Sequence, residues 1–458
     1  MSQPTSYSSE NLDPWNIEIT DKKHLRKIFE NAQKPKNKSM IGVEYELFAV
    51  YGPDLSPLPF EGDISINTLF ETLIQKSIEN GDKLSPIYDD GHLVALENKQ
   101  TIIALEPGGQ LEIAAKPKDS LVQCIKTFND LILFITQCAN ELGIKLLSLG
   151  FQPWATKEQM ARVKKSRYSI MKNYMPQVGS MGLDMMYRTC AIQINIDYEN
   201  EADMAKKMRI AAILSPMFSA LFSSCAFNEN KLVNQAVFRG HVWQNTDKNR
   251  TGIPKDVFLP NFSYDSWIDF ALDVPMYFIR RNEQYIDMSG KSFRDFINNG
   301  FLDFKASVRD FIDHMSTIFT EVRLKPFIEF RSIDCLPVIY VNALSALIWC
   351  FFYNDKIFKQ LENKFNLATF NDVEKMHNEV ILNGCNTKFL EKSLWKWWQE
   401  LIALTLNSQE EVYLEPIKTI INNKITAADW IKTHSLKENS NNKNWLLKYF
   451  SPLSKSFL

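Results

Sequence analysis

Hydrophobic and polar residues alternate in the segment IGVEYELFAV (residues 41–50), and a period of two is typical of a β-strand. Glu44 and Glu46 fall on one side of this strand, whereas Val43 and Leu47 fall on the other. The pattern therefore predicts a strand with an apolar face and a face that carries two carboxylates.

Two later segments repeat the same alternation. TCAIQINIDY places Gln193 and Asn195 on a polar side opposite three isoleucines, and PFIEFRS places Glu329 and Arg331 on a common side opposite apolar neighbours. We expect the three strands to belong to one sheet, with the apolar face in the core and the polar face lining a ligand site.

The remaining pattern predicts an α+β fold. Short apolar runs over residues 84–114 are separated by DDGH, ENKQ and PGG, which favours hairpins of an antiparallel sheet. Residues 20–33 and 119–142 have the spacing of amphipathic helices. We predict a curved antiparallel sheet with helices on its outer side, in one domain over residues 1–458 whose C-terminal part, from about 338 to 458, is mostly helical.

Two long apolar stretches call for a comparison with membrane spans. Val338 to Tyr353 is shorter than about 18 residues and contains Asn342, and Ile210 to Phe227 is interrupted by Pro216. Both stretches are predicted to be buried core helices, and no membrane association is expected.

Composition narrows the function. The 52 Lys and Arg nearly balance the 54 Asp and Glu, so the chain lacks the basic excess of nucleic-acid-binding proteins. The seven cysteines include no CxxC pair, and the first residues are polar, without a targeting signal. We predict a cytoplasmic enzyme with small ligands, and a surface loop at KENSNNKN near residue 440.

Acidic residues recur on the predicted polar face. Five carboxylates converging there would repel one another unless cations held them, and oxygen ligands without a His or Cys cluster suit magnesium. The spacing alone favours an ordinary solvated sheet face over a metal site. The glycines of LEPGGQLEIA favour the ligand site, because backbone without side chains admits a close approach. The five residues are Glu44, Glu46, Glu106, Glu112 and Glu329.

Longer blocks carry a resemblance to a known family. IGVEYELF, LEPGGQLEIA, RYSIMKNYMPQVGSMGLDMMYRTCAIQINIDY, FRGHVWQNTDKNRTG, ALDVPMYFIRR and TIFTEVRLKPFIEFRS resemble the plant-type glutamate-cysteine ligases, which also occur in proteobacteria. The match runs in one order over about residues 40 to 335, which makes accidental agreement improbable.

The resemblance implies a fold similar to the catalytic domain of glutamine synthetase and guanido kinases. It also implies an ATP- and Mg²⁺-dependent ligase acting on glutamate and cysteine as a monomer or homodimer. In such enzymes the side-chain carboxylate of glutamate attacks the terminal phosphate of ATP, and the amine of cysteine displaces phosphate from the acyl phosphate. The product is γ-glutamylcysteine, formed in the first step of glutathione synthesis.

The same resemblance suggests residue roles. The five glutamates above resemble magnesium ligands, and Arg331 would steady the transferring phosphoryl group. Arg167 and Arg239 resemble clamps for the backbone carboxylate of glutamate, and Tyr277 resembles a tyrosine of the substrate pocket. Three further residues would contact substrates, although an ordinary core or sheet-surface role fits them as well: Trp243, Gln193 and Asn195.

Two departures from the family pattern leave the acceptor amine open. Tyr45 stands where many relatives carry His, and SIDCLPVIYV lacks the glycines and tryptophan of a GADGGPW-like segment. The alternatives are a ligase for a different amine, a guanidino phosphotransferase, and a non-catalytic binding protein with the same fold.

Overall fold

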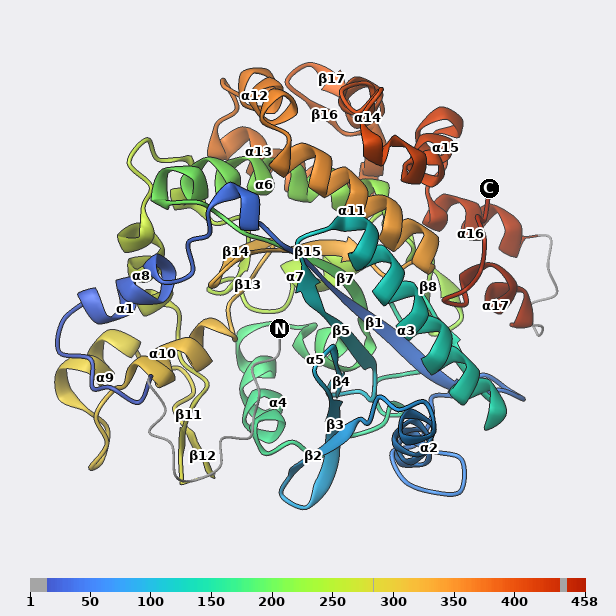
Figure 1. Ribbon diagram of the computed structural model, residues 1–458, viewed down its shortest axis with the longest axis horizontal. Coiled ribbons are helices and arrows are strands. Elements are labelled where there is room, and N and C mark those ends of the chain that lie inside the picture. The colour runs from blue at the N-terminus through green and yellow to red at the C-terminus, as the bar shows by residue number, and fades with distance from the viewer. Residues whose placement is uncertain (1–14, 283, 437–442) are drawn as a thin grey trace.

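The computed structural model describes residues 15–282, 284–436 and 443–458, so the predicted loop at KENSNNKN and the polar N-terminal segment lie largely outside the described residues. Its centre is an antiparallel sheet in the order β14-β15-β7-β1-β5-β4-β3-β2, with β6 paired to β1 (Figure 1). The bounds are β1 Ile41–Tyr51, β2 Ser85–Asp89, β3 His92–Glu97, β4 Thr101–Leu105, β5 Leu111–Lys118, β6 Ile144–Leu147, β7 Ala191–Ile196, β14 Val322–Leu324 and β15 Ile328–Asp334. The three predicted strands and the hairpins are therefore confirmed.

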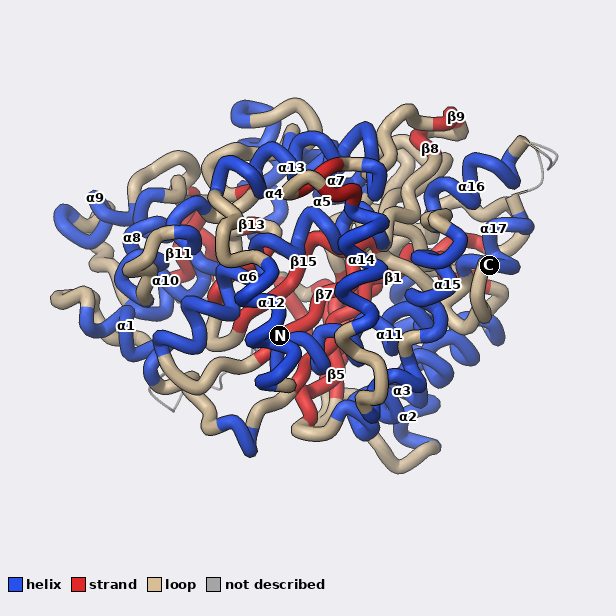
Figure 2. The backbone as a smooth tube through the Cα atoms, turned by 90° about the horizontal axis from the view of Figure 1, so that it is seen from above, coloured by secondary structure: helices blue, strands red, loops and turns tan. Residues whose placement is uncertain are grey.

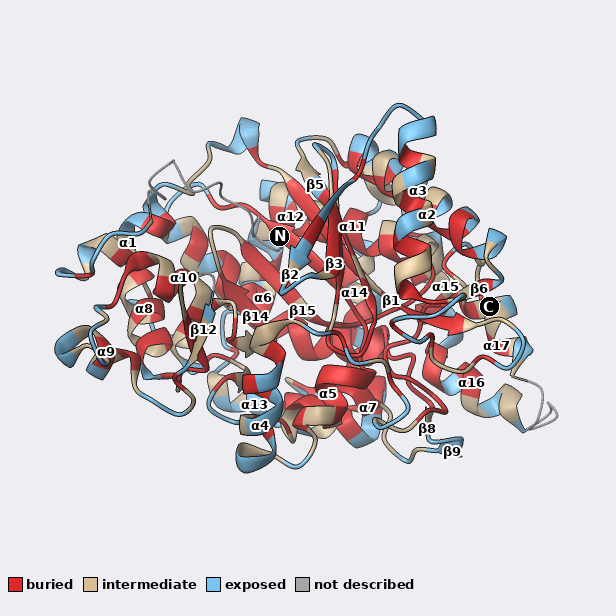
Figure 3. Ribbon diagram, turned by 90° about the horizontal axis from the view of Figure 1, so that it is seen from below, coloured by how far each residue is buried: buried red, intermediate tan, exposed pale blue. Residues whose placement is uncertain are grey.

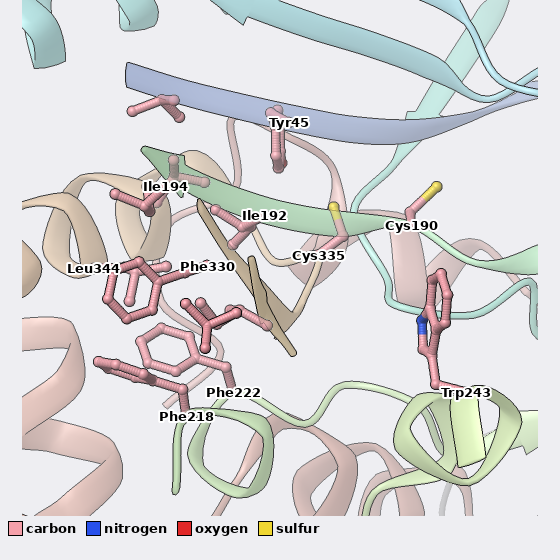
Figure 4. Packing of buried hydrophobic residues seen from close by; sticks show 14 of the residues in the cluster. Tyr45, Cys190, Ile192, Ile194, Phe218, Phe222, Trp243, Phe330, Cys335 and Leu344 are labelled. Atoms are coloured by element: carbon pink, nitrogen blue, oxygen red, sulfur yellow. The ribbon is translucent and has the colours of Figure 1, made fainter. Parts of the chain in front are cut away.

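One face of the sheet packs against α3 (Leu121–Glu141), α6 (Glu201–Leu221) and α11 (Val338–Tyr353). The isoleucines of β7 belong to this face, and Figure 4 shows Ile192 and Ile194 above the aromatic rings of Phe218, Phe222 and Phe330. Burial of large apolar side chains is the main driving force here. A single cluster of buried hydrophobic residues extends along the chain from Ile19 to Phe457.

Val338 to Tyr353 is a core helix, as predicted, whereas the stretch from Ile210 to Phe227 is a core helix only as far as Leu221, and Phe227 belongs to a two-residue strand. The interior residues of α6 and α11 are almost all buried, and Pro216 lies inside α6. Among the described residues no single helix has the length and hydropathy of a bilayer span; α11 reaches that threshold only together with α12 (Asp355–Lys364), and the two are bent by 84°.

The elements α4, α5, α7, α10, β11 and β12 lie around the opposite face of the sheet, whereas α2 packs against α3 (Figure 3). The opening helix α1 is shorter than the predicted residues 20–33. The bounds are α1 Lys23–Glu30, α2 Ile66–Glu79, α4 Ser166–Val178, α5 Gly182–Arg188, α7 Phe238–Gln244, α8 Tyr264–Asp273, α9 Phe293–Asn299, α10 Val308–Met315, β8 Phe227–Asn228, β9 Lys231–Leu232, β10 Thr251–Gly252, β11 Phe278–Arg281, β12 Gln284–Asp287 and β13 Phe319–Thr320. Single turns of 3₁₀-helix lie at Lys36–Lys38 and Lys255–Phe258.

The C-terminal part is mostly helical and lies along the α6 and α11 side of the molecule (Figure 2). A hairpin of two-residue strands interrupts it, where Leu390 and Glu391 both adopt positive φ. The bounds are α12 Asp355–Lys364, α13 Phe370–Asn383, β16 Lys388–Phe389, β17 Lys392–Ser393, α14 Leu394–Ala403, α15 Glu415–Asn423, α16 Ala427–Ser435 and α17 Asn444–Phe450, with 3₁₀ turns at Gly384–Asn386 and Gln409–Tyr413. The backbone N–H of Ser148 donates to the carbonyl of Phe450 at 2.7 Å, which ties this end to the sheet.

Candidate active site

Strand register brings the predicted carboxylates together. Glu46 of β1 lies directly opposite Glu112 of β5, and Glu44 lies opposite Gln193 of β7. Since residues opposite one another on neighbouring strands share a face, these side chains project from the same side of the sheet. The polar face predicted from alternation is therefore present.

This polar face forms one wall of a cavity of about 860 Å³. The opposite walls come from α4, α5, α7, α10 and the β11–β12 hairpin. Nine predicted site residues line the cavity: Glu44, Glu46, Glu106, Glu112, Arg167, Gln193, Arg239, Trp243 and Arg331. Three do not line it: Asn195, Tyr277 and Glu329.

Neighbouring donors orient the carboxylates of β1. The Gln193 amide donates to Glu46 Oε1 and the Ala191 backbone N–H donates to Glu46 Oε2, both at 2.8 Å. Asn195, the next residue of β7 on the same face, donates to Glu44 Oε1 at 2.7 Å. Gln193 and Asn195 therefore orient the two glutamates by hydrogen bonds, and Asn195 does so although it does not line the cavity.

The carboxylates of the cavity wall destabilise one another as anions. Burial, and secondly the charge of Glu106, raise the pKa of Glu46 to about 7. Burial and the charge of Glu106 also raise the pKa of Glu112 well above its usual range. A wall of this kind lowers its electrostatic energy by taking up protons or a cation.

Glu106 stands in a turn that is held from several sides. Gly109 adopts a φ of +82°, which glycine tolerates, and its N–H donates to the Glu106 carbonyl at 2.9 Å. Lys165 Nζ and the Tyr168 hydroxyl both donate to the Leu105 carbonyl, at 2.7 and 3.1 Å. The PGG signal predicted this turn correctly.

Lys165 also lines the cavity and was missed from the sequence. Burial, and secondly the charge of Arg167, lower its pKa to about 8, whereas nearby carboxylates oppose that shift. Lys165 lies two residues before Arg167, just outside the block RYSIM. Its place in KKSRY, next to a predicted site residue, was the sequence signal that could have identified it.

Glu329 has a different environment from Glu46 and Glu112. Its fully buried carboxylate is paired with Arg323, with Lys325 at 3.3 Å and with Arg331 at 3.3 Å. Burial alone would raise the pKa of this carboxyl, but the three cations hold it well below its usual range. Arg331 continues the network by donating to Gln193 Oε1 at 2.7 Å.

Arg239, Arg331 and Trp243 present hydrogen-bond donors at the cavity. In the described part of the chain, Arg239 Nε, Arg331 Nε and the Trp243 indole nitrogen are buried and have no hydrogen-bond partner. Both guanidinium groups face the Trp243 ring, at 5.7 and 6.0 Å from its centroid. Buried donors without acceptors are costly, and a bound carboxylate or phosphate supplies acceptors.

Tyr277 lies behind the cavity wall rather than on it. Its ring packs against the Arg250 guanidinium, whose carbon is 3.9 Å from the ring centroid, and only 1% of the residue is exposed. Arg250 is itself fixed by Asp247, with Nε and Oδ2 2.7 Å apart. The structure gives Tyr277 no contact with the cavity.

The two departures from the family pattern contact each other. The Tyr45 hydroxyl donates to the Leu336 carbonyl at 2.8 Å and shares a hydrogen bond of 2.8 Å with the Ser148 hydroxyl, on the side of β1 away from Glu44 and Glu46. Tyr45, Cys335 and Leu336 are fully buried and do not line the cavity. Tyr45, Cys335 and Leu336 therefore lie behind the cavity wall.

The donor set fits a hard divalent cation by its chemistry. Four carboxylates share one cavity, and burial together with the charge of Glu106 raises the pKa of two of them, Glu46 and Glu112. The pKa of Glu44 is lowered to about 2 although burial opposes this shift, and Lys325 is one of the positive charges that lower it. The side chains are not gathered into a finished coordination shell: within residues 15–282, 284–436 and 443–458, no group of three or more His, Cys, Asp or Glu side chains has the arrangement of a metal site.

The cavity therefore combines a carboxylate wall on an antiparallel sheet with buried guanidinium and indole donors that have no partner in the described part of the chain. The fold is similar to that of the solved glutamate–cysteine ligase of Francisella tularensis in complex with AMP, with a TM-score of 0.53 at 12% identity over 90% of this chain and 87% of that one. At this identity the likeness establishes the α+β fold with its large antiparallel sheet.

Sequence comparison gives the family. The model of Glutamate-cysteine ligase family 2 (GCS2) matches residues 40–443. The chain is 34% identical over 407 residues to the chloroplastic glutamate–cysteine ligase of Medicago truncatula, covering 86% of this chain and 78% of that relative. It is 34% identical over 406 residues to the enzyme of the same name from Arabidopsis thaliana, covering 86% and 76%. The chain belongs to this family, and the match extends beyond the predicted residue 335 into the C-terminal helices.

Proposed function

We propose that the protein joins the γ-carboxylate of glutamate to the amino group of cysteine at the expense of ATP. Family membership supports this reaction, and so does the cavity, which has carboxylates on one wall and cationic donors beside them. The observation that carries the proposal is the strand register that places Glu46 opposite Glu112 and beside Glu44. The product would be γ-glutamylcysteine.

The carboxylate wall would hold magnesium together with the phosphates of ATP. Bound there, Mg²⁺ would neutralise phosphate charge, which otherwise repels an attacking carboxylate. The four residues that support this role are Glu44, Glu46, Glu106 and Glu112. Only the family resemblance supports Glu329 as a magnesium ligand. The role that we propose for Glu329 is to form ion pairs that hold Arg323 and Arg331 in place.

The protein side chains would bind and orient the substrates. Arg239, with the Trp243 indole N–H beside it, would bind the backbone carboxylate of glutamate by donating hydrogen bonds to it. Arg331 would stabilise the charge on the phosphoryl group as the side-chain carboxylate of glutamate attacks it. Arg167, on the α4 side of the cavity, would bind a carboxylate as a second clamp. The cysteine amine would then displace phosphate from the acyl phosphate.

A direct assay tests the reaction. Purified protein with ATP, Mg²⁺, glutamate and cysteine should release one phosphate for each γ-glutamylcysteine formed, and omission of any one component should stop the reaction. Turnover that is equally fast with 2-aminobutyrate, which lacks the thiol, would contradict the cysteine assignment. A phosphorylated guanidine as product, or no turnover with any amine, would contradict the ligase itself.

A cytoplasmic location and a monomeric or dimeric state stay predictions of the same proposal, whereas the plant relatives above are named chloroplastic. Cell fractionation tests the location, and light scattering of the purified chain tests the oligomeric state.

A further inference from the structure

Asp334, at the end of β15, is a fully buried carboxylate directly behind the cavity. It does not line the cavity itself. Asp334 Oδ2 accepts hydrogen bonds from the Ser224 backbone N–H at 2.9 Å and from the Cys225 thiol at 3.0 Å. Its other oxygen, Oδ1, has no hydrogen-bond partner among the described residues. One edge of the carboxylate is thus fixed, and the other remains available.

The available edge faces Arg239. Asp334 Oδ1 lies 3.9 Å from Arg239 Nη1, and both side chains are almost completely excluded from solvent. Burial raises the pKa of Asp334, and the positive charge of Arg239 opposes that rise. Because an uncompensated buried charge is strongly destabilising, a carboxylate at this place needs the guanidinium, and the guanidinium needs the carboxylate.

The surrounding chain is shaped to hold Asp334. Gly150 approaches so closely that a Cβ on this residue would lie 2.5 Å from Asp334 Cγ. The Gly150 N–H donates to Ser224 Oγ at 2.8 Å, and Ser224 Oγ donates to the Cys335 carbonyl at 2.9 Å. Only a residue without a side chain fits at position 150 while the carboxylate keeps this position.

Two nitrogens of the Arg239 guanidinium have protein partners, and the third is buried without one. Nη1 faces Asp334, Nη2 donates to the Arg331 carbonyl at 3.0 Å, and Nε has no partner in the described part of the chain. A guanidinium fixed in this way presents its remaining donor in one direction without a further loss of conformational freedom.

We propose that Asp334 is a positioning residue that orients Arg239 for the backbone carboxylate of glutamate. The identity of this ligand rests on the proposed function. The buried carboxylate, its fixed edge and the space left by Gly150 support the positioning whichever ligand Arg239 binds. The sequence signal was one acidic residue inside the apolar stretch SIDCLPVIYV, which the alternation of strands did not single out.

The test is Asp334→Asn, which keeps the shape and removes the charge. We expect the dissociation constant and the KM for glutamate to rise about tenfold, while the KM for ATP and for cysteine stay within about twofold. Binding of glutamate alone is measured by calorimetry, and KM by the phosphate-release assay. An unchanged glutamate affinity would overturn the proposal.

Asp197→Asn is the matched control. Asp197 is also a buried carboxylate at the end of a strand, β7, where it accepts from Lys34 and from the Met40 N–H, both at 2.8 Å, away from the cavity. This variant should lose thermal stability and keep its glutamate affinity. If both variants lose affinity for all three substrates alike, Asp334 is merely structural and the proposal fails.

If Asp334→Asn does not fold, the glutamate affinity of a second variant, Gly150→Ala, tests the proposal. It keeps every charge and displaces Asp334, so glutamate affinity should fall in the same direction. Calorimetry also distinguishes a failure of the Asp334 proposal from a failure of the proposed function. If the wild type turns over and both variants bind glutamate as the wild type does, only the role of Asp334 is wrong. If the wild type binds no glutamate, the proposed function is wrong as well.

Discussion

Glu46 and Glu329 lie on one sheet, two strands apart, yet their charges are handled in opposite ways. Glu46 receives two hydrogen bonds from neutral groups and retains a pKa raised to about 7, because burial and Glu106 disfavour its anion. Glu329 is paired with three cations, and its pKa lies well below its usual range.

The difference separates two uses of a buried carboxylate. Glu329 completes an ion-pair network within the protein and orders Arg323 and Arg331. Glu46 and its neighbours form a site with excess negative charge, which a substrate-borne or free cation can neutralise. The same residue type at the same strand spacing therefore predicts a ligand site in one place and a structural network in the other.

The largest effect is expected at Glu106. Glu106→Gln should lower the rate of γ-glutamylcysteine formation about a thousandfold or more, since it would remove a charged ligand from the proposed metal site. Glu97→Gln is the control, because Glu97 also lines the cavity but lies outside the proposed set, and its rate should stay within a few-fold of the wild type. Full activity of Glu106→Gln would remove the metal assignment.

Folding stability separates Glu329 from Glu46. Glu329→Gln leaves Arg323 buried without its carboxylate, so the free energy of unfolding should fall by about 3–5 kcal/mol. Glu46→Gln in metal-free protein at pH 8 should not destabilise, because it relieves repulsion with Glu106. Urea denaturation of the two variants beside the wild type measures both values. Equal losses would show that the two environments are energetically alike.

The pH dependence of the metal-free protein should carry the signature of Glu46. A carboxyl whose pKa is raised in the folded state holds a proton that the unfolded chain has lost, so stability falls as pH rises from about 4.5 to 7. Relative to Glu46→Gln, the wild type should lose on the order of 1–3 kcal/mol between pH 5 and 8. Added Mg²⁺ should restore most of this loss. A difference between the two proteins that does not vary with pH would contradict the raised pKa.

The smallest effect is expected at Tyr277. Its hydroxyl is buried without a hydrogen-bond partner among the described residues, and its ring packs on Arg250 and, in a T-shaped contact, against Tyr174. Tyr277→Phe should therefore leave the KM for each substrate within about twofold and should not lower the melting temperature. A severalfold rise in the KM for glutamate would instead support the substrate contact that the family resemblance suggests.

The fold was largely predictable because alternation and turn residues are local signals. Glu44 and Glu46 alternate with apolar neighbours, and the glycines after Glu106 mark its turn, so the strands and the polar face followed from the sequence. The sequences of β1, β5 and β7 do not show that these strands pair, yet the pairing of β1 with β5 brings Glu46 and Glu112 together.

The parts that could not be predicted depend on contacts between distant segments. Lys325 and Arg323 precede Glu329 in the chain, but nothing in the alternation shows that they neutralise it. Asp334 gains its role only because Ser224 and Arg239, more than ninety residues away, fold against it. Tyr277 belongs to a block that resembles the family, yet its position behind the wall became visible only in three dimensions.

The central claim is that the wall of Glu44, Glu46, Glu106 and Glu112 binds a divalent cation. Electron paramagnetic resonance of Mn²⁺ titrated into the nucleotide-free protein at pH 8 tests it most directly. The account predicts bound Mn²⁺ in the wild type, competition by Mg²⁺, and loss of the bound ion in a Glu46→Gln/Glu112→Gln double variant that remains folded. Retention of the same amount of bound Mn²⁺ by that folded variant would contradict it.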